Sequence, residues 1–187
     1  MRIKKISNDE IQNGKPSASE VRLKKRTPVC VVLDGVRSKY NIGSIFRSSD
    51  ATLVEKVFLT GISPQPPHPA IDKSALGATD VVPWQYCPSA VEAVKDLKAR
   101  GFFIVALELT HSSIPYSEMK YKFPMCLIIG NEVDGVSDDL LDLCDAAIDI
   151  PMYGRANSLN VANAYSIAIF EILRQYNHDR AGFLQPH

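Results

Sequence analysis

The sequence predicts an α/β fold, in which a mostly parallel sheet is flanked by helices on both faces. Apolar runs of strand length alternate along the chain with amphipathic stretches of helical period, and most connections between them are short. The strand candidates are almost continuously apolar, which is typical of strands buried on both faces of a parallel sheet. We therefore expect one α/β domain over residues 29–177, preceded by a basic arm (1–28) and followed by a loose tail (178–187).

The arm is basic although the whole chain has no net charge. Residues 1–28 hold eight Lys or Arg residues and three acidic residues, so the arm carries +5 and the remainder −5. Such asymmetry suggests an arm that meets phosphate, and a solvated flexible terminus explains it about as well. Weak helical periodicity allows one short helix in the arm.

The first half of the domain predicts three strands. Residues 29–33 form the first, and Ser38 or Asn41 can cap the helix that follows. Residues 57–61 form the second. Residues 81–86 form a short third strand, placed at a sheet edge because Pro83 lacks a backbone donor.

A proline-rich segment follows the second strand. Residues 63–69 contain four prolines, so they are predicted to be a rigid loop that is neither helix nor strand. The small residues after it, up to Ala78, would let the backbone approach a neighbour or a ligand closely.

The next stretch predicts a helix, a strand and a connector. Residues 89–100 are amphipathic, with Ser89 as the N-cap and Gly101 at the C-terminal stop position. The strand over residues 102–107 ends at Glu108. Residues 110–123 are expected to be irregular, with one possible helical turn.

The last third predicts two strands that end on loop residues, and then a long helix. The run over residues 126–129 stops at Gly130, and the run over residues 146–150 stops at Pro151. Ser137 caps a short helix between them, and the last helix runs from about residue 160 to 176. Ligand sites of α/β sheets lie at such strand ends, so a site is expected there.

Composition and missing motifs exclude several classes. Hydrophobic content is 45% and charged content 22%, as in ordinary globular proteins. The chain lacks G-x-G-x-x-G, G-x-x-x-x-G-K-[ST] and G-x-S-x-G, and its histidines and cysteines show no metal spacing. It has no signal-peptide h-region and no apolar run near about 18 residues. We expect a cytoplasmic protein without a metal site or membrane contact.

Three constellations remain. In Asn41-x-Gly43-x-x-x-Arg47, the arginine alone is equally well explained as a surface residue. In Gly130-x-Glu132-x-x-Gly135, a turn with an exposed glutamate is the better interpretation of the motif alone. In Ser158-Leu159-Asn160-Val161, the serine alone is best explained as an N-cap. Their combination in this order is far more specific than any one of them.

That combination resembles the SpoU-type, or TrmH-like, branch of the SPOUT methyltransferases. The resemblance rests on NIGSIFRSSDA (41–51), LIIGNEVDGVS (127–137) and IPMYGRANSLNVANAYSIAIFE (150–171), with KSALGA (73–78) as a further matching feature. It implies a knotted α/β fold in which the C-terminal strand and helix thread through an earlier loop, although knots are rare. It also implies S-adenosylmethionine as the cofactor, methylation of a ribose 2′-hydroxyl in RNA, and a homodimer with the last helix in its interface.

The resemblance also implies roles for individual residues. The cofactor-binding residues would be Leu107, Glu108, Leu109, Gly130, Asn131, Ile150, Met152, Ser158 and Leu159. The catalytic set would be Arg47, Asn41, Glu132, Ser158 and Asn160.

Side-chain chemistry refines the roles of the catalytic set. A guanidinium is too basic to lose its proton readily, so Arg47 is expected to orient the 2′-hydroxyl and the adjacent phosphate. Asn41 would position Arg47 or the substrate, and Glu132 would hold Arg47 or a ribose hydroxyl. Ser158 and Asn160 would fix the cofactor loop and donate to the substrate.

The sequence does not identify the RNA substrate. The resemblance implies transfer RNA or ribosomal RNA, and it implies an extra N-terminal RNA-binding domain in many members that act on ribosomal RNA. Only about 28 residues precede the first strand here, which slightly favours transfer RNA, or an RNA recognised by both subunits. A non-catalytic RNA-binding protein that keeps the fold is the alternative.

Overall fold

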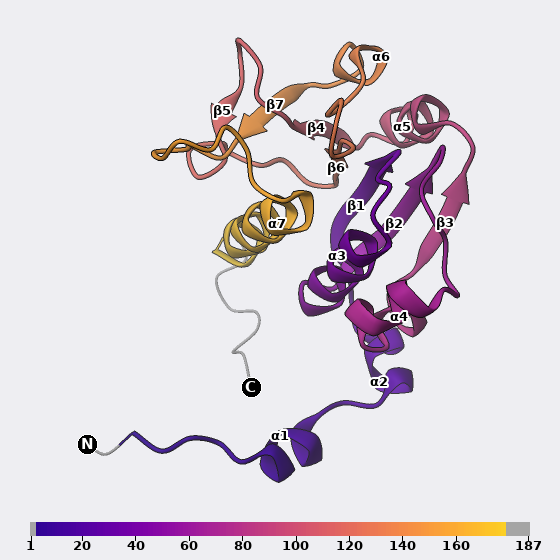
Figure 1. Cartoon of the computed structure of the whole chain (residues 1–187), viewed down its shortest axis with the longest axis vertical. Helices are drawn as coiled ribbons and strands as arrows, with labels where there is room; N and C mark the ends of the chain where they lie inside the picture. The colour runs from indigo at the N-terminus through magenta and orange to yellow at the C-terminus, as the bar shows by residue number, and fades with distance from the viewer. Residues whose placement is uncertain (1–2, 179–187) are drawn as a thin grey trace.

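The computed structural model describes residues 3–178. Of the loose tail expected over residues 178–187, His178 belongs to the last helix, and residues 179–187 lie outside the described residues, as do the first two residues of the arm. Figure 1 shows a sheet with helices packed on it and an arm that extends away from the body. The strands are β1 (Thr27–Asp34), β2 (Val54–Thr60), β3 (Trp84–Cys87), β4 (Phe103–Leu107), β5 (Ile114–Pro115), β6 (Met125–Ile129) and β7 (Ala146–Asp149). The helices are α1 (Asn8–Gly14), α2 (Ala18–Leu23), α3 (Lys39–Ala51), α4 (Pro69–Ala75), α5 (Ala90–Ala99), α6 (Asp138–Leu141), α7 (Val161–His178) and a 3₁₀ turn, η1 (Ala78–Asp80).

The described strands form one seven-stranded sheet in the order β3-β2-β1-β6-β4-β7-β5, and every neighbouring pair is parallel. The predicted α/β class is therefore confirmed, and β3 is an edge strand as Pro83 predicted. β7 comes last in the chain but lies between β4 and β5. The carboxyl ends of β6, β4 and β7 consequently meet at one edge of the sheet.

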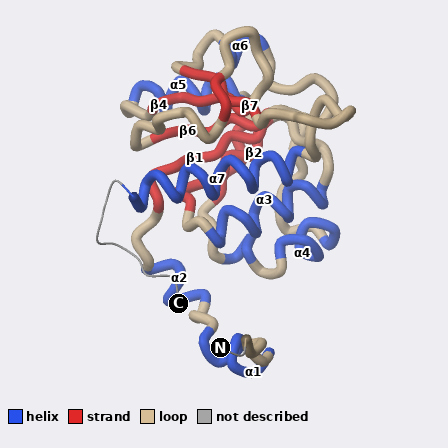
Figure 2. The backbone as a smooth tube through the Cα atoms, turned by 90° about the vertical axis from the view of Figure 1, so that its left-hand side faces the viewer, coloured by secondary structure: helices blue, strands red, loops and turns tan. Residues whose placement is uncertain are grey.

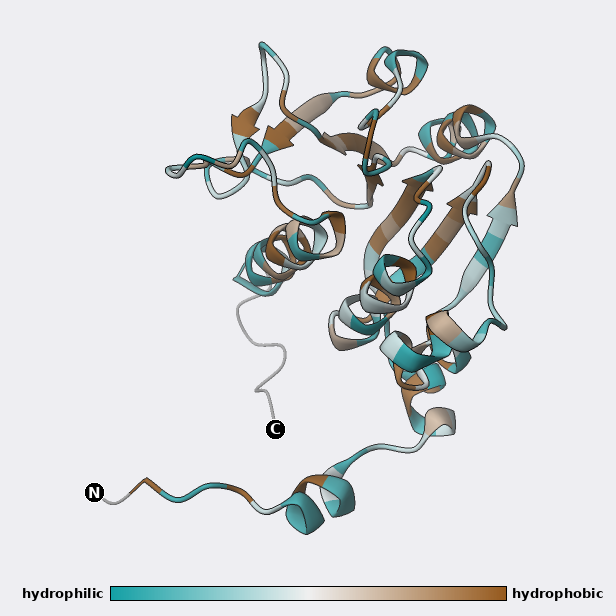
Figure 3. Ribbon diagram, in the orientation of Figure 1, coloured by the Kyte–Doolittle hydropathy of each residue, from teal (hydrophilic) through white to brown (hydrophobic). Residues whose placement is uncertain are grey.

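Two hydrophobic clusters lie on opposite faces of the sheet. Alternate side chains of β1, such as Val31 and Leu33, pack with α3, α4 and α7 on one face. The intervening ones, such as Val32, pack with α5 and α6 on the other. Figure 2 shows α3 and α7 side by side on their face. Figure 3 shows hydrophobic residues along β1 and β2, whose alternate side chains are buried in the two clusters, as expected of strands covered on both faces.

Three sequence predictions need correction. Pro69 was assigned to a non-helical loop, yet it begins α4, because the first turn of a helix does not use the amide that proline lacks. The connector over residues 110–123 contains the short strand β5. The arm holds two helices rather than one, each started by a capping box, Ser7 with Glu10 and Ser17 with Glu20.

The arm is tied to the body only near its end. The Arg22 guanidinium donates two hydrogen bonds to the Asp80 carbonyl, 3.1 Å from Nε and 2.7 Å from Nη2. Arg26 donates from Nη2 to the Val81 carbonyl at 2.6 Å. Residues 3–20 are exposed throughout. Within residues 3–178, no helix is long and apolar enough to cross a bilayer.

Candidate active site

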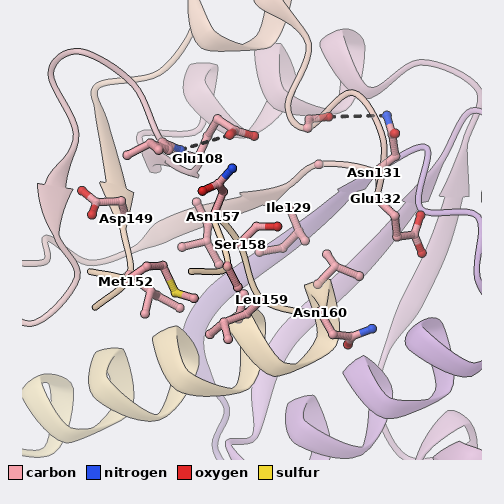
Figure 4. Close-up of a pocket in the computed structure, with 18 of the residues that line it drawn as sticks. Glu108, Ile129, Asn131, Glu132, Asp149, Met152, Asn157, Ser158, Leu159 and Asn160 are labelled. Carbon is pink, nitrogen blue, oxygen red and sulfur yellow. Dashed lines mark hydrogen bonds between the residues drawn. The ribbon is translucent and has the colours of Figure 1, made fainter. Parts of the chain in front are cut away.

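A pocket of about 730 Å³ opens at the carboxyl ends of β4, β6 and β7 (Figure 4). Its walls come from three segments, residues 107–109, 129–135 and 149–161, and from Ala164 of α7. The structure brings together all nine residues predicted to bind a cofactor, namely Leu107, Glu108, Leu109, Gly130, Asn131, Ile150, Met152, Ser158 and Leu159. A pocket therefore lies where the strand ends predicted a site, and both the site and the role of each residue stay predictions.

Further lining residues were not singled out in the sequence. Ile129 and Asp149 end β6 and β7, and Asn157 lies in the loop before α7 (Figure 4). Ile129 and Asp149 belong to the apolar runs whose ends predicted the site. Their place at the end of an apolar run is the sequence signal from which these two residues could have been predicted.

The loop after β6 needs its glycines. A Cβ at Gly130 would meet the backbone of Gly135 and Val136, and Gly135 itself has a φ of +71°. The Asn131 side-chain oxygen accepts from the N–H groups of Val133 (3.0 Å) and Asp134 (2.9 Å) and so closes the turn. The G-x-E-x-x-G pattern thus marks a tight loop whose backbone borders the pocket.

Glu108 holds this loop from β4. One carboxylate oxygen accepts from the Val136 N–H at 2.9 Å, and the other accepts from the Leu109 N–H at 3.0 Å. The bond from Val136 fixes the loop after β6 to the end of β4, its neighbour in the sheet, and so joins two walls of the pocket.

Glu132 anchors the start of α3. Its Oε2 accepts from the Arg37 N–H at 3.1 Å, and its Oε1 accepts from the Ser38 N–H at 3.1 Å and the Asn41 amide at 2.8 Å. The sequence left open whether Glu132 would hold Arg47, and in the structure its partners are these three donors instead. A carboxylate at the positive end of a helix is favourable.

Asn41 continues this contact to α7. Its side-chain oxygen accepts from the Asn160 amide at 3.1 Å, while its own amide donates to Glu132. The Asn160 side-chain oxygen accepts from the Ala162 N–H at 3.0 Å, so Asn160 caps α7. The sequence assigned the capping role to Ser158, which instead lies exposed in the pocket wall. Glu132, Asn41 and Asn160 form a bridge, named the Asn41 bridge below, that links the three motifs.

Arg47 stands apart from the pocket. It is exposed on α3 and does not line the cavity, and within residues 3–178 its side chain makes no hydrogen bond or ion pair. It lies six positions after Asn41, which is about 9 Å along the helix. Arg47 is thus free to contact a large molecule that lies across α3 and reaches the pocket.

Helix α3 is held rigidly on its other sides. Ser49 and Tyr165 hydroxyls share a buried hydrogen bond of 2.7 Å, and Ser48 and Ser166 share another of 2.7 Å, both between α3 and α7. A Cβ at Gly43 would meet Ser74 and the Ile71 carbonyl of α4. The glycine in the first motif therefore permits the close packing of α3 on α4.

The Asn41 bridge predicts a pH dependence. Burial raises the pKa of Glu132, but hydrogen bonds from the Arg37 N–H, the Asn41 amide and the Ser38 N–H outweigh it, so the pKa lies below its ordinary value of 4.5. A carboxylate with a lowered pKa stabilises the fold above its unfolded pKa, about 4.3, and this contribution is lost as the pH falls through the folded pKa. The melting temperatures of the wild type and Glu132→Gln should therefore differ most near neutral pH and converge in acid.

Thermal unfolding followed by circular dichroism over a series of pH values tests this. Glu118→Gln, in the connector after β5, is the control, because within the described residues no side-chain bond of Glu118 holds two elements together. A gap between wild type and Glu132→Gln that stays constant into acid would contradict the assignment.

The chain is similar to known proteins over the region that contains the three motifs. The model of the SpoU rRNA methylase family matches residues 28–170. A Staphylococcus saprophyticus protein named for the TrmH family of tRNA/rRNA methyltransferases is 32% identical over 148 residues, 79% of this chain and 59% of the relative. The Vibrio parahaemolyticus 23S rRNA (guanosine-2′-O-)-methyltransferase RlmB is 32% identical over 158 residues, 83% of this chain and 63% of the relative. The chain spans about three fifths of the length of these curated relatives.

Solved structures share the fold. The TrmH/SpoU tRNA modifying enzyme of A. aeolicus superposes with a TM-score of 0.79 at 31% identity, covering 87% of this chain and 84% of that one. The SpoU methyltransferase AviRb from Streptomyces viridochromogenes, crystallised in complex with AdoMet, superposes with a TM-score of 0.74 at 30% identity, covering 90% of this chain and 64% of that one.

Proposed function

The chain belongs to the SpoU rRNA methylase family, and on that premise we propose that it transfers a methyl group from S-adenosylmethionine to a ribose 2′-hydroxyl of structured RNA. The observation that carries the proposal is the Asn41 bridge. It fixes the helix that bears Arg47 against the rim of a ligand-sized pocket built from three strand ends.

The pocket fits the cofactor. Its volume of about 730 Å³ lies in the range of roughly 300–1,000 Å³ that is usual for small-molecule sites. Leu107, Ile129, Ile150 and Leu159 offer an apolar slot for the adenine, and the backbone of the adjoining loops offers donors and acceptors. S-adenosylmethionine supplies a methyl group on a sulfonium, which an oxygen displaces in line, so that positioning is the main task of the protein.

Arg47 is assigned to the substrate. A guanidinium is a poor general base, so Arg47 is given a binding role and not the role of the base. It binds the 2′-hydroxyl and the adjacent phosphate through its fork of N–H donors, which orients the hydroxyl oxygen toward the pocket. Ser158 is exposed at the pocket wall and donates to the same nucleotide.

Asn41, Glu132 and Asn160 are positioning residues in this proposal. The Asn41 side chain, both oxygens of Glu132 and the side-chain oxygen of Asn160 are occupied within the protein. Their task is to hold α3, the loop after β6 and the start of α7 in one arrangement.

We further propose a homodimer formed through α7. Ile167 and Phe170 lie on the outer face of this helix with 36% and 51% of their surface exposed. Burying such a face against a second copy would remove apolar area from water.

The insertion of the late strand β7 between β4 and β5 supports the expected knot, since the chain from β4 to β5 must pass around it.

The substrate is proposed as transfer or ribosomal RNA. The names of the similar proteins divide between these two classes, so the slight preference for transfer RNA stays a prediction, as does the cytoplasmic location.

The alternative function is that of an RNA-binding protein without catalysis. It predicts no heat of binding when S-adenosylmethionine is titrated into the protein, whereas the proposed function predicts saturable binding and label transfer from methyl-labelled cofactor to unmodified RNA.

The basic arm predicts the salt dependence of RNA binding. Lys4, Lys5 and Lys15 are exposed on the arm, whereas Arg22 and Arg26 are engaged with the body. Replacing the three lysines by alanine should weaken RNA binding and make the plot of log K against log salt shallower by up to about 2–3. Lys95→Ala on α5 is the control, and an unchanged slope in the triple variant would show that these three lysines make no phosphate contact.

A further inference from the structure

One strip of the surface differs in charge from the rest of the domain. Arg37, Lys39, Tyr40, Ser44 and Arg47 are called the α3 strip here. No acidic residue occurs between Gly35 and Ser49, although residues 29–187 together carry a net charge of −5. The first turn of α3 likewise holds no acidic residue of its own. Arg37 forms an ion pair of 3.5 Å with Asp134 in the loop after β6. Lys39 and Arg47 therefore supply the positive charge of the α3 strip, which is complementary to phosphate.

The strip presents one ring to solvent. Tyr40 is 55% exposed, and among residues 3–178 its ring makes no aromatic contact and its hydroxyl no hydrogen bond. Tyr40, Ser44 and Arg47 stand at positions i, i+4 and i+7, which share one face of a helix. Tyr40 and Arg47 are thus about 10 Å apart along the same face.

The backbone that carries Tyr40 is held in place relative to the pocket. Tyr40 is adjacent to Asn41, whose amide is bonded to the pocket residue Glu132, and Glu132 also holds the N–H groups of Arg37 and Ser38. The Arg37 and Ser38 N–H groups and the Asn41 amide are consequently held by one carboxylate. An exposed ring on such a rigid support is suited to stacking, because little side-chain freedom is lost when a flat ligand covers it.

We propose that Tyr40 is a stacking platform for an unpaired nucleobase of the substrate RNA, with Lys39 on a flanking phosphate. This rests on the proposed function and names the substrate class of the same site: the nucleotide next to the pocket is unpaired, as in a loop or bulge. A base within a duplex is stacked on its neighbours and cannot cover the ring. Tyr40 therefore sets the preference for single-stranded over duplex RNA and does not touch the cofactor.

Binding of two labelled RNA probes tests the proposal by fluorescence anisotropy at fixed salt. One probe is a single-stranded oligouridylate of about 16 nucleotides, and the other is an RNA duplex of the same length. Tyr40→Ala should weaken binding of the single strand roughly 5- to 150-fold, the value of one stacked base, and leave duplex binding within about twofold. Tyr40→Phe, which keeps the ring, should restore single-strand binding. Lys39→Ala should weaken binding of both probes alike, since phosphate is common to them.

The controls separate this proposal from the proposed function. Gln85→Ala on the edge strand β3 is exposed and remote, and should bind both probes like the wild type. Unchanged single-strand binding in Tyr40→Ala, or an equal loss of binding to both probes, would overturn the stacking role of Tyr40. If the wild type still transfers the labelled methyl group, the proposed function would stand. Absence of label transfer by the wild type would instead reject the methyltransferase function, whatever the probes show.

Discussion

Arg47→Ala is expected to lower methyl transfer to RNA roughly 10²- to 10³-fold, the usual effect of removing one preorganised donor from a transition state. Binding of S-adenosylmethionine should stay within about twofold, because Arg47 does not line the pocket and bonds none of its loops. Single-turnover transfer of a labelled methyl group measures the first quantity, and calorimetric titration with the cofactor measures the second.

Two variants control this result. Arg47→Lys keeps the charge but loses the planar fork of donors, so it should recover little of the rate. Arg100→Ala, at the end of α5 on the opposite face of the sheet, should transfer methyl groups like the wild type. Full activity of Arg47→Ala with normal cofactor binding would remove Arg47 from the catalytic set.

Gly130→Ala is expected to lower the affinity for S-adenosylmethionine at least about tenfold. The added Cβ would meet backbone atoms of Gly135 and Val136, which are main-chain groups and not the flexible end of a side chain. The loop after β6 must therefore move, which displaces a pocket wall and breaks the bond from the Val136 N–H to Glu108. Overpacking of this kind costs about 1–3 kcal/mol of stability.

Calorimetry and thermal unfolding measure the two effects of Gly130→Ala. Gly14→Ala provides the matched control, because a Cβ there meets no atom within 4 Å. It should preserve both the melting temperature and the cofactor affinity. Wild-type affinity in Gly130→Ala would mean that the loop after β6 does not form a wall of the cofactor site.

The position of the site was predictable from the sequence because of how parallel sheets are built. Strands buried on both faces read as continuous apolar runs, and the residues that end them fall at one sheet edge. Gly130 and Ile150 were found in this way, and the loops around them line one pocket. The edge strand β3 was found from Pro83 for an equally local reason.

The contacts within the site were not predictable in the same way. Glu132 holds the start of α3 because β6 lies next to β1 in the sheet, a neighbour relation that spans almost 100 residues of sequence. The choice of Asn160 over Ser158 as the cap of α7 depends on where that helix begins, which periodicity locates only to within a few residues. The start of α4 at Pro69 was not predicted, because proline breaks a helix in its interior but is compatible with its first turn.

The central claim is that the chain methylates a ribose 2′-hydroxyl of RNA with the help of Arg47. Mass spectrometry of nucleosides from cells that lack the gene, complemented either with the wild type or with Arg47→Ala, tests it most directly. We predict that one 2′-O-methylated nucleoside disappears without the gene, returns with the wild type and does not return with Arg47→Ala. An unchanged set of 2′-O-methylated nucleosides in the cells lacking the gene, or the loss of a base-methylated nucleoside instead, would contradict the claim.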